Sequence, residues 1–289
     1  MKHSRRRFLQ LMAIMTGSFL IPRPGIPAIW AANSEKRPLG SGKKGLHLSP
    51  LTSIDYFLKE KVEYDISFLW FKKAAFGTLT FEREGDGYKA VLQAETKGFV
   101  GFFTSYRKHT YISHISYSPE MGKFRARRFE RYVTIKEKQE KTITDLDYKT
   151  RTMNWKDYKD GILKEDKSEP MSGEHDHEDV LSAFYNFRMG VFGPIKRDRE
   201  FKVNTIPEKG VSTIDVKIGS LAEAYGSKRL FGKGFKKEMF HIKVRVPKEI
   251  FKSRHGVVDI WVDEQIIPIR GVVKDYIGFG DIRGTLKRG

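Results

Sequence analysis

The chain contains no cysteine among its 289 residues. It therefore has no disulfide bonds, no thiolate nucleophile, no iron–sulfur cluster and no cysteine-ligated zinc, and no lipid-modified cysteine can follow its N-terminal region. Its stability must come from the packing of apolar side chains. With 39% hydrophobic and 13% aromatic residues, the sequence is rich enough in such side chains to fill a core.

Motifs for catalysis and cofactor binding are also missing. The sequence has no HExxH pair and no G-x-S-x-G elbow, and Gly232 and Gly234 form a lone GxG without the strand-to-helix context of a dinucleotide site. The acidic pair Asp263 and Glu264 is adjacent along an expected strand, so the two side chains point to opposite faces. We therefore predict no cofactor and favour a noncatalytic protein.

Long hydrophobic runs are absent, and the most apolar stretch, FLQLMAIMTGSFLI, lies close to the N-terminus. Its length falls short of the roughly 20 residues that span a bilayer. The basic MKHSRRR precedes it, the breaker-rich PRPGIPAIWAAN follows it, and no acid occurs before Glu35. This pattern predicts an export signal over residues 1–32. Within it, SRRRFLQ resembles the twin-arginine consensus, which the twin-arginine export machinery reads as an address.

Removal of the predicted signal lowers the formal charge from +18 to +13, because the segment carries five cations and no acid. Residues 33–50 are rich in Gly, Ser, Pro and Lys and predict a flexible leader, followed by one mature domain over 51–289. We expect a periplasmic protein whose partners are lipid or another anionic component of the envelope. Nucleic acid is not an expected partner in that compartment.

Strands dominate the rest of the chain. Between Lys61 and Phe71, apolar and polar residues alternate, which predicts a strand with one buried face. That face carries Val62, Tyr64, Ile66, Phe68 and Trp70. Similar runs recur to the C-terminus, separated by turn sequences such as Gly85-Asp86-Gly87. The pattern predicts a mainly β fold in which a strongly curved antiparallel sheet, a partial barrel or a sandwich, packs against one helix.

The single convincing helix is DVLSAFYNFRMG, expected from about 179 to 189. Its apolar residues Val180, Leu181, Phe184 and Phe187 lie within one helical stripe. Asp176 or Asp179 is suited to cap the free amide groups of the first turn. We expect the helix to pack on the concave side of the sheet.

The acidic and histidine-rich residues before this helix permit a second interpretation. His175, Asp176 and His177 carry imidazole and carboxylate groups that borderline metals accept. Adjacent loop residues rarely converge on one ion, so the capping interpretation is preferred and the metal site is kept as an alternative. Ser182, Asp179 and the two histidines have the residue types of a catalytic triad. The G-x-S-x-G motif that would support such a triad is absent.

The run EDVLSAFYNFR resembles the D-x-L-S-x-x-Y-x-x-R signature of the DUF3108 family of exported bacterial proteins, with Asp179, Ser182, Tyr185 and Arg188 at the signature positions. YDISFLWFKKAAFGTLTFE, YKAVLQAETKGFVGFF and VDIWVDEQIIPIRGVV are similar to other segments of that family. The resemblance covers residues from about 60 to 287. It implies an envelope protein of largely β structure and supplies no catalytic residues.

Two segments are candidates for ligand contacts. In TKGFVGFFTSY, Phe99, Phe102 and Phe103 lie between or beside glycines and are suited to the lip of an apolar groove. In YGSKRLFGKGFKKE, Lys228, Arg229 and Lys233 are suited to anionic head groups. For each segment, a packed turn or a solvated connector is the simpler explanation.

The leading hypothesis is a noncatalytic periplasmic protein that holds an amphipathic anionic ligand, such as a lipid, in an apolar groove with a basic rim. The alternative is an enzyme, either a hydrolase of envelope polymers or a metal-dependent protein using residues 175–177. A structural partner in an envelope complex is a third class. Oligomeric state is not readable from the sequence.

Overall fold

The computed structural model describes residues 47–58, 60–98, 101, 105–171, 176–206, 212–236, 238–246, 253–276 and 280–287. All of them belong to one compact unit, which spans Leu46–Gly289. The signal predicted for residues 1–32 and most of the predicted leader lie outside the described residues. Within the described part of the leader, His47–Leu48 forms β1 and pairs with β10 (Ile195–Lys196), so regular structure begins earlier than the expected residue 51.

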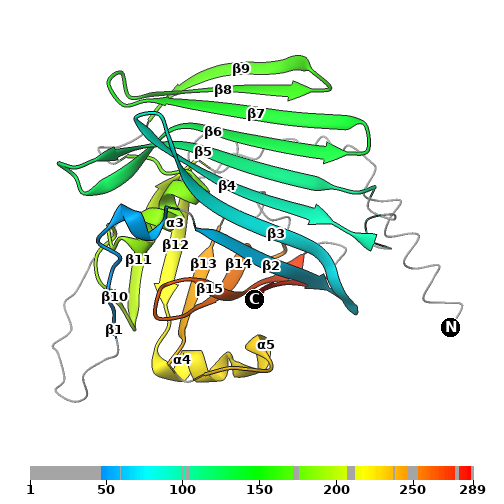
Figure 1. Ribbon diagram of the computed structural model, residues 1–289, viewed down its shortest axis with the longest axis vertical. Helices are drawn as coiled ribbons and strands as arrows, with labels where there is room; N and C mark the ends of the chain where they lie inside the picture. The colour runs from blue at the N-terminus through cyan, green and yellow to red at the C-terminus, as the bar shows by residue number, and fades with distance from the viewer. Residues whose placement is uncertain are drawn as a thin grey trace, which may run out of the picture. The chain divides into compact units, whose positions relative to one another are not determined.

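Fourteen of the described strands form one antiparallel sheet, which confirms the mainly β prediction (Figure 1). The first group comprises β2 (Lys61–Phe68), β3 (Phe71–Glu84), β4 (Gly87–Thr96), β5 (Lys108–Ser118), β6 (Lys123–Ile135), β7 (Lys138–Asp147), β8 (Thr152–Lys159) and β9 (Ile162–Pro170). The second group comprises β11 (Arg199–Thr205), β12 (Ser212–Ile218), β13 (Phe240–Arg245), β14 (Val257–Val262), β15 (Pro268–Tyr276) and β16 (Gly280–Leu286). Short hairpins connect most neighbours, as expected for antiparallel strands.

The two groups of strands join where the last strand pairs with the first. Arg283 on β16 lies opposite Ser67 on β2, so the strand order runs from β11 through β16 and then from β2 to β9. Strands β11 and β9 are the two edges of this sheet. The chain passes from one edge to the other through the helix α3 (Val180–Arg188), which lies between the two groups in Figure 1.

The sheet bends around α3. This helix contacts β4, β5 and β6 and also β11, which lies far from them in the strand order. Strands so distant within one sheet can reach the same short helix only if the sheet curves, which confirms the curvature expected from the sequence.

The described structure also contains shorter helical segments. They are the 3₁₀ helix η2 (Ile54–Tyr56), α4 (Leu221–Gly226) and α5 (Lys228–Phe231). None of the helices in the described part of the chain has the length and the apolar character needed to cross a bilayer. The segment 225–238, expected as a loop, therefore contains the end of α4 and all of α5.

Two strand predictions were wrong in detail. The strand expected to continue to Phe71 ends at Phe68, and Trp70 lies in the turn with 66% of its surface exposed. Val62 and Phe68 are buried as expected, whereas Tyr64 and Ile66 are half-buried. The sequence reading also missed β9, because nearly all of its residues are exposed and no apolar alternation marks it. Its lysines and acids suit an edge strand, where charge discourages pairing with another chain.

Candidate functional site

The helix α3 begins at a buried cap, Asp179. The Asp179 carboxylate accepts hydrogen bonds from the backbone amides of Leu181 at 2.7 Å and Ser182 at 3.1 Å, and the Ser113 hydroxyl of β5 donates to its other oxygen. The capping interpretation of the sequence is thus confirmed. Burial is the main cause that raises the pKa of Asp179, despite these hydrogen bonds.

Asn186 joins α3 to the backbone of β6. Its amide oxygen accepts from the Phe124 N–H at 2.8 Å, and its amide nitrogen donates to the Phe124 carbonyl at 2.9 Å. Strand β6 pairs with β7 only from Arg128 onward, so Phe124 has no strand partner on that side. The Asn186 amide replaces the missing strand and satisfies both buried backbone groups.

The last turn of α3 carries a buried ion pair. Arg188 Nη1 lies 2.7 Å from Glu60 Oε2, and the two side chains are 2% and 9% exposed. The Tyr185 hydroxyl donates to the same carboxylate oxygen at 3.3 Å. The guanidinium also stacks over the ring of Phe57 at 4.8 Å. These contacts fix the end of the helix against the chain that leads into β2.

The signature residues Asp179, Ser182, Tyr185 and Arg188 therefore share one buried face of α3. The Ser182 hydroxyl donates to the Asp179 carbonyl at 3.2 Å and is fully buried, so it is not placed as an accessible nucleophile. Each signature residue makes a contact that positions the helix. We therefore interpret the signature as the set of residues that docks α3 on the sheet.

The opposite face of α3 is apolar and incompletely covered. Val180 is 46% exposed, and Phe184 and Phe187 are half-buried. The sequence stripe that placed Leu181 with these residues was wrong on this point, because Leu181 is buried with the polar face. Val180, Phe184 and Phe187 instead line a cavity between the helix and the second group of strands.

This cavity has a volume of about 280 Å³. That is roughly twice the volume of an engineered apolar cavity of about 150 Å³ that binds benzene. Its lining is almost entirely aliphatic and aromatic. The lining residues are Leu92, Tyr111, Val180, Ala183, Phe184, Phe187, Phe192, Phe201, Val203, Thr205, Ile206, Ile214, Val216, Ile242, Val244, Val246, Val258, Ile260, Val262, Ile266 and Pro268.

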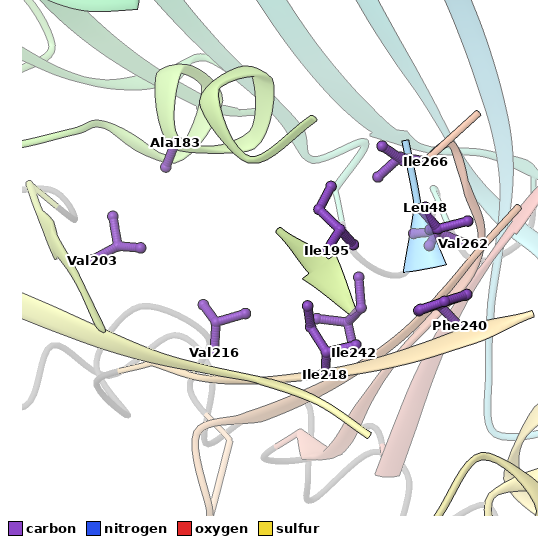
Figure 2. Packing of buried hydrophobic residues seen from close by; sticks show 10 residues of the cluster. All are labelled: Leu48, Ala183, Ile195, Val203, Val216, Ile218, Phe240, Ile242, Val262 and Ile266. Atoms are coloured by element: carbon purple, nitrogen blue, oxygen red, sulfur yellow. The ribbon is translucent and has the colours of Figure 1, made fainter. Parts of the chain in front are cut away.

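The sheet wall of the cavity consists of apolar residues in register across neighbouring strands. Phe201 lies opposite Val216, which lies opposite Val244, and Val244 in turn lies opposite Val258. A period of two places such residues on one face of every strand, so the rows form a continuous apolar surface. Figure 2 shows Val216 on this wall and Ala183 on α3 directed toward one another.

Thr205, at the end of β11, is a polar exception in the lining. It is 4% exposed, and its hydroxyl makes no hydrogen bond with the described residues. The backbone groups beside Thr205 do have hydrogen-bond partners. Glu178 forms a β-bridge with Thr205, and the Glu178 carbonyl accepts a hydrogen bond from the Ile206 amide. A buried hydroxyl without a partner favours a ligand with a polar atom at this end of the cavity.

A second polar group, Glu178, is buried at the start of α3. It is 3% exposed, and one carboxylate oxygen has no hydrogen-bond partner among the described residues. Burial raises its pKa to about 7 and outweighs the lowering effect of the nearby Ser182, Lys123 and Asn186. Glu178 therefore titrates near neutral pH.

The candidate metal ligands are placed only in part. His175 lies outside the described residues, whereas the Asp176 carboxylate lies 2.7 Å from Lys123 Nζ and 3.0 Å from Arg125 Nε. These two cations help to hold the pKa of Asp176 below its usual range although burial acts in the opposite direction. His177 is buried, and burial lowers its pKa. The described residues contain no group of three or more His, Asp or Glu that could hold a metal ion.

Of the six predicted ligand residues, the structure describes Lys228, Arg229 and Lys233. Phe99, Phe102 and Phe103 lie outside the described residues. Lys228 and Arg229 begin α5, and Lys233 follows it, so none of these cations contributes to the cavity lining. The residues that line the cavity were not among the predicted ligand residues, although many of them belong to the alternating apolar stretches 199–205, 211–218, 239–246 and 257–264.

Comparisons with known proteins concern family and fold. The model of the family described as "Protein of unknown function (DUF3108)" matches residues 63–287. A crystal structure of a beta-barrel-like protein of domain of unknown function DUF1849 from Brucella abortus is similar, with a TM-score of 0.45 and 10% identity over 80% of this chain and 97% of that chain. A DUF1089 family protein from Pseudomonas aeruginosa has a TM-score of 0.34 and 13% identity over 68% and 88% of the two chains. A comparison with curated proteins found no match.

Proposed function

This chain belongs to the DUF3108 family, and we propose that it is a noncatalytic binding protein that holds the apolar part of an amphipathic ligand, such as an acyl chain, between α3 and strands β11–β15. The observation that carries the proposal is the cavity of about 280 Å³ with its nearly uniform aliphatic and aromatic lining. Preformed apolar pockets with few polar groups are typical of small-molecule sites.

The exposure of apolar residues on α3 supports the same conclusion. A short helix enclosed by a sheet normally buries its apolar stripe, yet Val180 is 46% exposed while the polar Ser182 and Asn186 are fully buried. The docked face of α3 thus combines these buried polar groups with the buried Leu181 and Tyr185, whereas Val180, Phe184 and Phe187 are left partly exposed for contact with a ligand. Bound hydrocarbon would remove Val180, Phe184 and Phe187 from water.

The ligand is amphipathic in this proposal because the Thr205 hydroxyl in the lining has no hydrogen-bond partner among the described residues. A carboxylic acid or hydroxyl group is small enough to pair with it. The net positive charge of the chain favours an anionic head group over a cationic one.

We further propose that the protein works in the periplasm after export by the twin-arginine route. Arg5 and Arg6 within SRRRFLQ, followed by a short and weakly apolar run, support this address. Replacement of both arginines by lysine should leave the precursor in the cytoplasm, as measured by fractionation and immunoblotting. Arg23→Lys serves as the control, and normal export of the double variant would contradict the route.

Ligand binding is tested first on protein purified from its own periplasm. Organic extraction followed by mass spectrometry should recover an amphiphile in near-stoichiometric amount. The delipidated protein should then bind a fluorescent fatty acid, cis-parinaric acid, with saturation.

A pair of variants on one strand provides the decisive control. Val258 lines the cavity, whereas the adjacent Val257 points to the opposite face of β14. Val258→Phe should reduce probe affinity at least tenfold and remove the co-purifying amphiphile, while Val257→Phe should change neither. Equal binding by the two folded variants, or no amphiphile and no probe binding by the wild type, would remove the proposal.

A further inference from the structure

A second surface, away from the cavity lining, combines exposed cations with exposed apolar side chains. It lies on α4 and α5 and on the segment that follows them. We call it the α4–α5 surface and define it by Leu221, Tyr225, Lys228, Arg229, Lys233 and Lys236, all of which are exposed.

The inner face of α4 and α5 is already packed. Phe231 is buried and meets the ring of Trp261 edge-on at 5.4 Å. The Trp261 indole N–H donates to the Ser227 hydroxyl at 3.0 Å, and that hydroxyl donates to the Ala224 carbonyl at 2.6 Å. Ala224 on α4 and Phe231 on α5 are buried, and Ser227 between the two helices bonds to Trp261, so these residues form the side that faces the sheet.

Two arginines of the sheet donate hydrogen bonds to carbonyl groups at the end of α5. Arg270 donates to the Phe231 carbonyl and Arg283 donates to the Leu230 carbonyl, the latter at 2.7 Å. Arg270 also lies over the Phe231 ring at 4.5 Å. These contacts position α5 without using the four cations of the α4–α5 surface. Of its apolar residues, Tyr225 meets the ring of Phe235 edge-on at 6.0 Å.

The apolar residues of the surface lie on the outer side of α4. Leu221 is 43% exposed and Tyr225 is 45% exposed. They are four residues apart, so they are neighbours on α4. Lys228 and Arg229 begin the next helix, α5, and are also exposed. A leucine and a tyrosine held outward beside cations match the composition of interfacial segments, where an apolar side chain enters the acyl boundary and a tyrosine lies at head-group level.

The cations of the surface are not neutralised by neighbours. Among the described residues, Lys228, Arg229, Lys233 and Lys236 form no ion pair, whereas Lys217 on the adjoining strand lies 2.8 Å from Glu223 and 3.4 Å from Glu200. Gly232 and Gly234, both with positive φ, separate these cations along a tight turn. Four uncompensated positive charges on one small surface are complementary to a strongly anionic partner.

We propose that the α4–α5 surface docks the protein on a bilayer of anionic phospholipids. The cations attract the head groups, and Leu221 and Tyr225 enter the interface between head groups and acyl chains. An acidic protein would neutralise the four cations but would leave the two exposed apolar side chains without a role. We therefore propose a lipid surface as the partner. This proposal does not depend on ligand binding in the cavity.

Vesicle co-sedimentation tests the proposal. The protein should bind vesicles of phosphatidylglycerol and phosphatidylcholine in equal parts and should not bind vesicles of phosphatidylcholine alone. Since each cation near such a surface contributes about fivefold to binding, the K228Q/R229Q variant should bind roughly 25-fold more weakly. The K149Q/K164Q variant removes the same charge from exposed positions elsewhere and should bind within about twofold of the wild type.

A second variant isolates the apolar contribution. Leu221→Ser with Tyr225→Ser leaves the charge unchanged and should weaken binding at least fivefold, also in 0.5 M salt, where the charge contribution is screened. Unchanged unfolding temperatures would show that the variants fold. Equal losses for K228Q/R229Q and K149Q/K164Q, or full binding by the serine variant, would overturn the proposal. Probe binding in the cavity, measured on the same variants, should stay unchanged.

Discussion

Arg188 and Glu60 form a buried ion pair, with 2.7 Å between Nη1 and Oε2, that ties the end of α3 to the segment before β2. Arg188→Met should leave the Glu60 carboxylate buried, with the Tyr185 hydroxyl as its one remaining side-chain partner in the described part of the chain. We expect the free energy of unfolding to fall by about 3–5 kcal/mol, because an unpaired buried charge is strongly destabilising. Urea denaturation measures the change.

The double variant R188M/E60Q provides the control for this pair. Removing both charges should recover a large part of the lost stability, because no ion is then left without a partner. If the single and the double variant were equally unstable, the pair would matter through packing and not through charge.

Asn186→Leu should also destabilise the protein. The substitution keeps the side-chain size but leaves the N–H and C=O groups of Phe124 without partners. We expect a loss of about 2–4 kcal/mol in the free energy of unfolding, since each buried unsatisfied group costs roughly 1–3 kcal/mol. Thermal and urea denaturation measure it, with Lys149→Ala on the exposed surface as the control. An effect below 0.5 kcal/mol would show that β6 and α3 do not depend on this amide.

Glu178 predicts a pH dependence of stability. Its pKa in the folded protein is about 7, above the ordinary value of 4.5. The folded state therefore holds a proton that the unfolded state has lost between pH 4.5 and 7, so this group makes stability fall as pH rises through that window. Above pH 7 the full penalty, roughly 3 kcal/mol, is present.

The Glu178→Gln variant removes this titration. It should be more stable than the wild type at pH 8 and lose its advantage toward pH 4.5, as shown by urea denaturation across the range. Glu120→Gln, at an exposed position, should follow the wild-type profile. Parallel pH profiles for the wild type and Glu178→Gln would contradict the assigned pKa.

Thr205→Val tests the polar end of the cavity. Valine has nearly the same shape, and it removes a buried hydroxyl that has no partner among the described residues. We expect the ligand-free protein to gain about 1 kcal/mol of stability. Affinity for a fatty acid should fall several-fold, whereas affinity for a hydrocarbon of equal length should not fall. A loss of both affinities would show that Thr205 shapes the cavity and does not pair with the ligand.

Local sequence determined the strands and the start of the helix. Alternation such as Phe240, Ile242 and Val244 against His241 and Lys243 specifies a strand, because the side-chain period of extended backbone is two. The Asp179 cap was also predictable, since it acts on amides two and three residues away. Strand β9 was not predicted, because an exposed edge strand needs no apolar face and therefore shows no apolar alternation.

Tertiary structure alone decided which face of α3 is buried and where the cavity lies. Apolarity pointed to Val180, Leu181, Phe184 and Phe187 as one packed stripe. Of these four residues Leu181 alone is buried, and it shares the docked face with the polar Ser182, Asn186 and Arg188. Their partners, among them Phe124 and Glu60, are distant in sequence, and only the bent sheet brings them to the helix. The cavity likewise lies where the second group of strands faces α3, which is docked on β4, β5 and β6 of the first group. No local sequence pattern specifies this contact between distant segments.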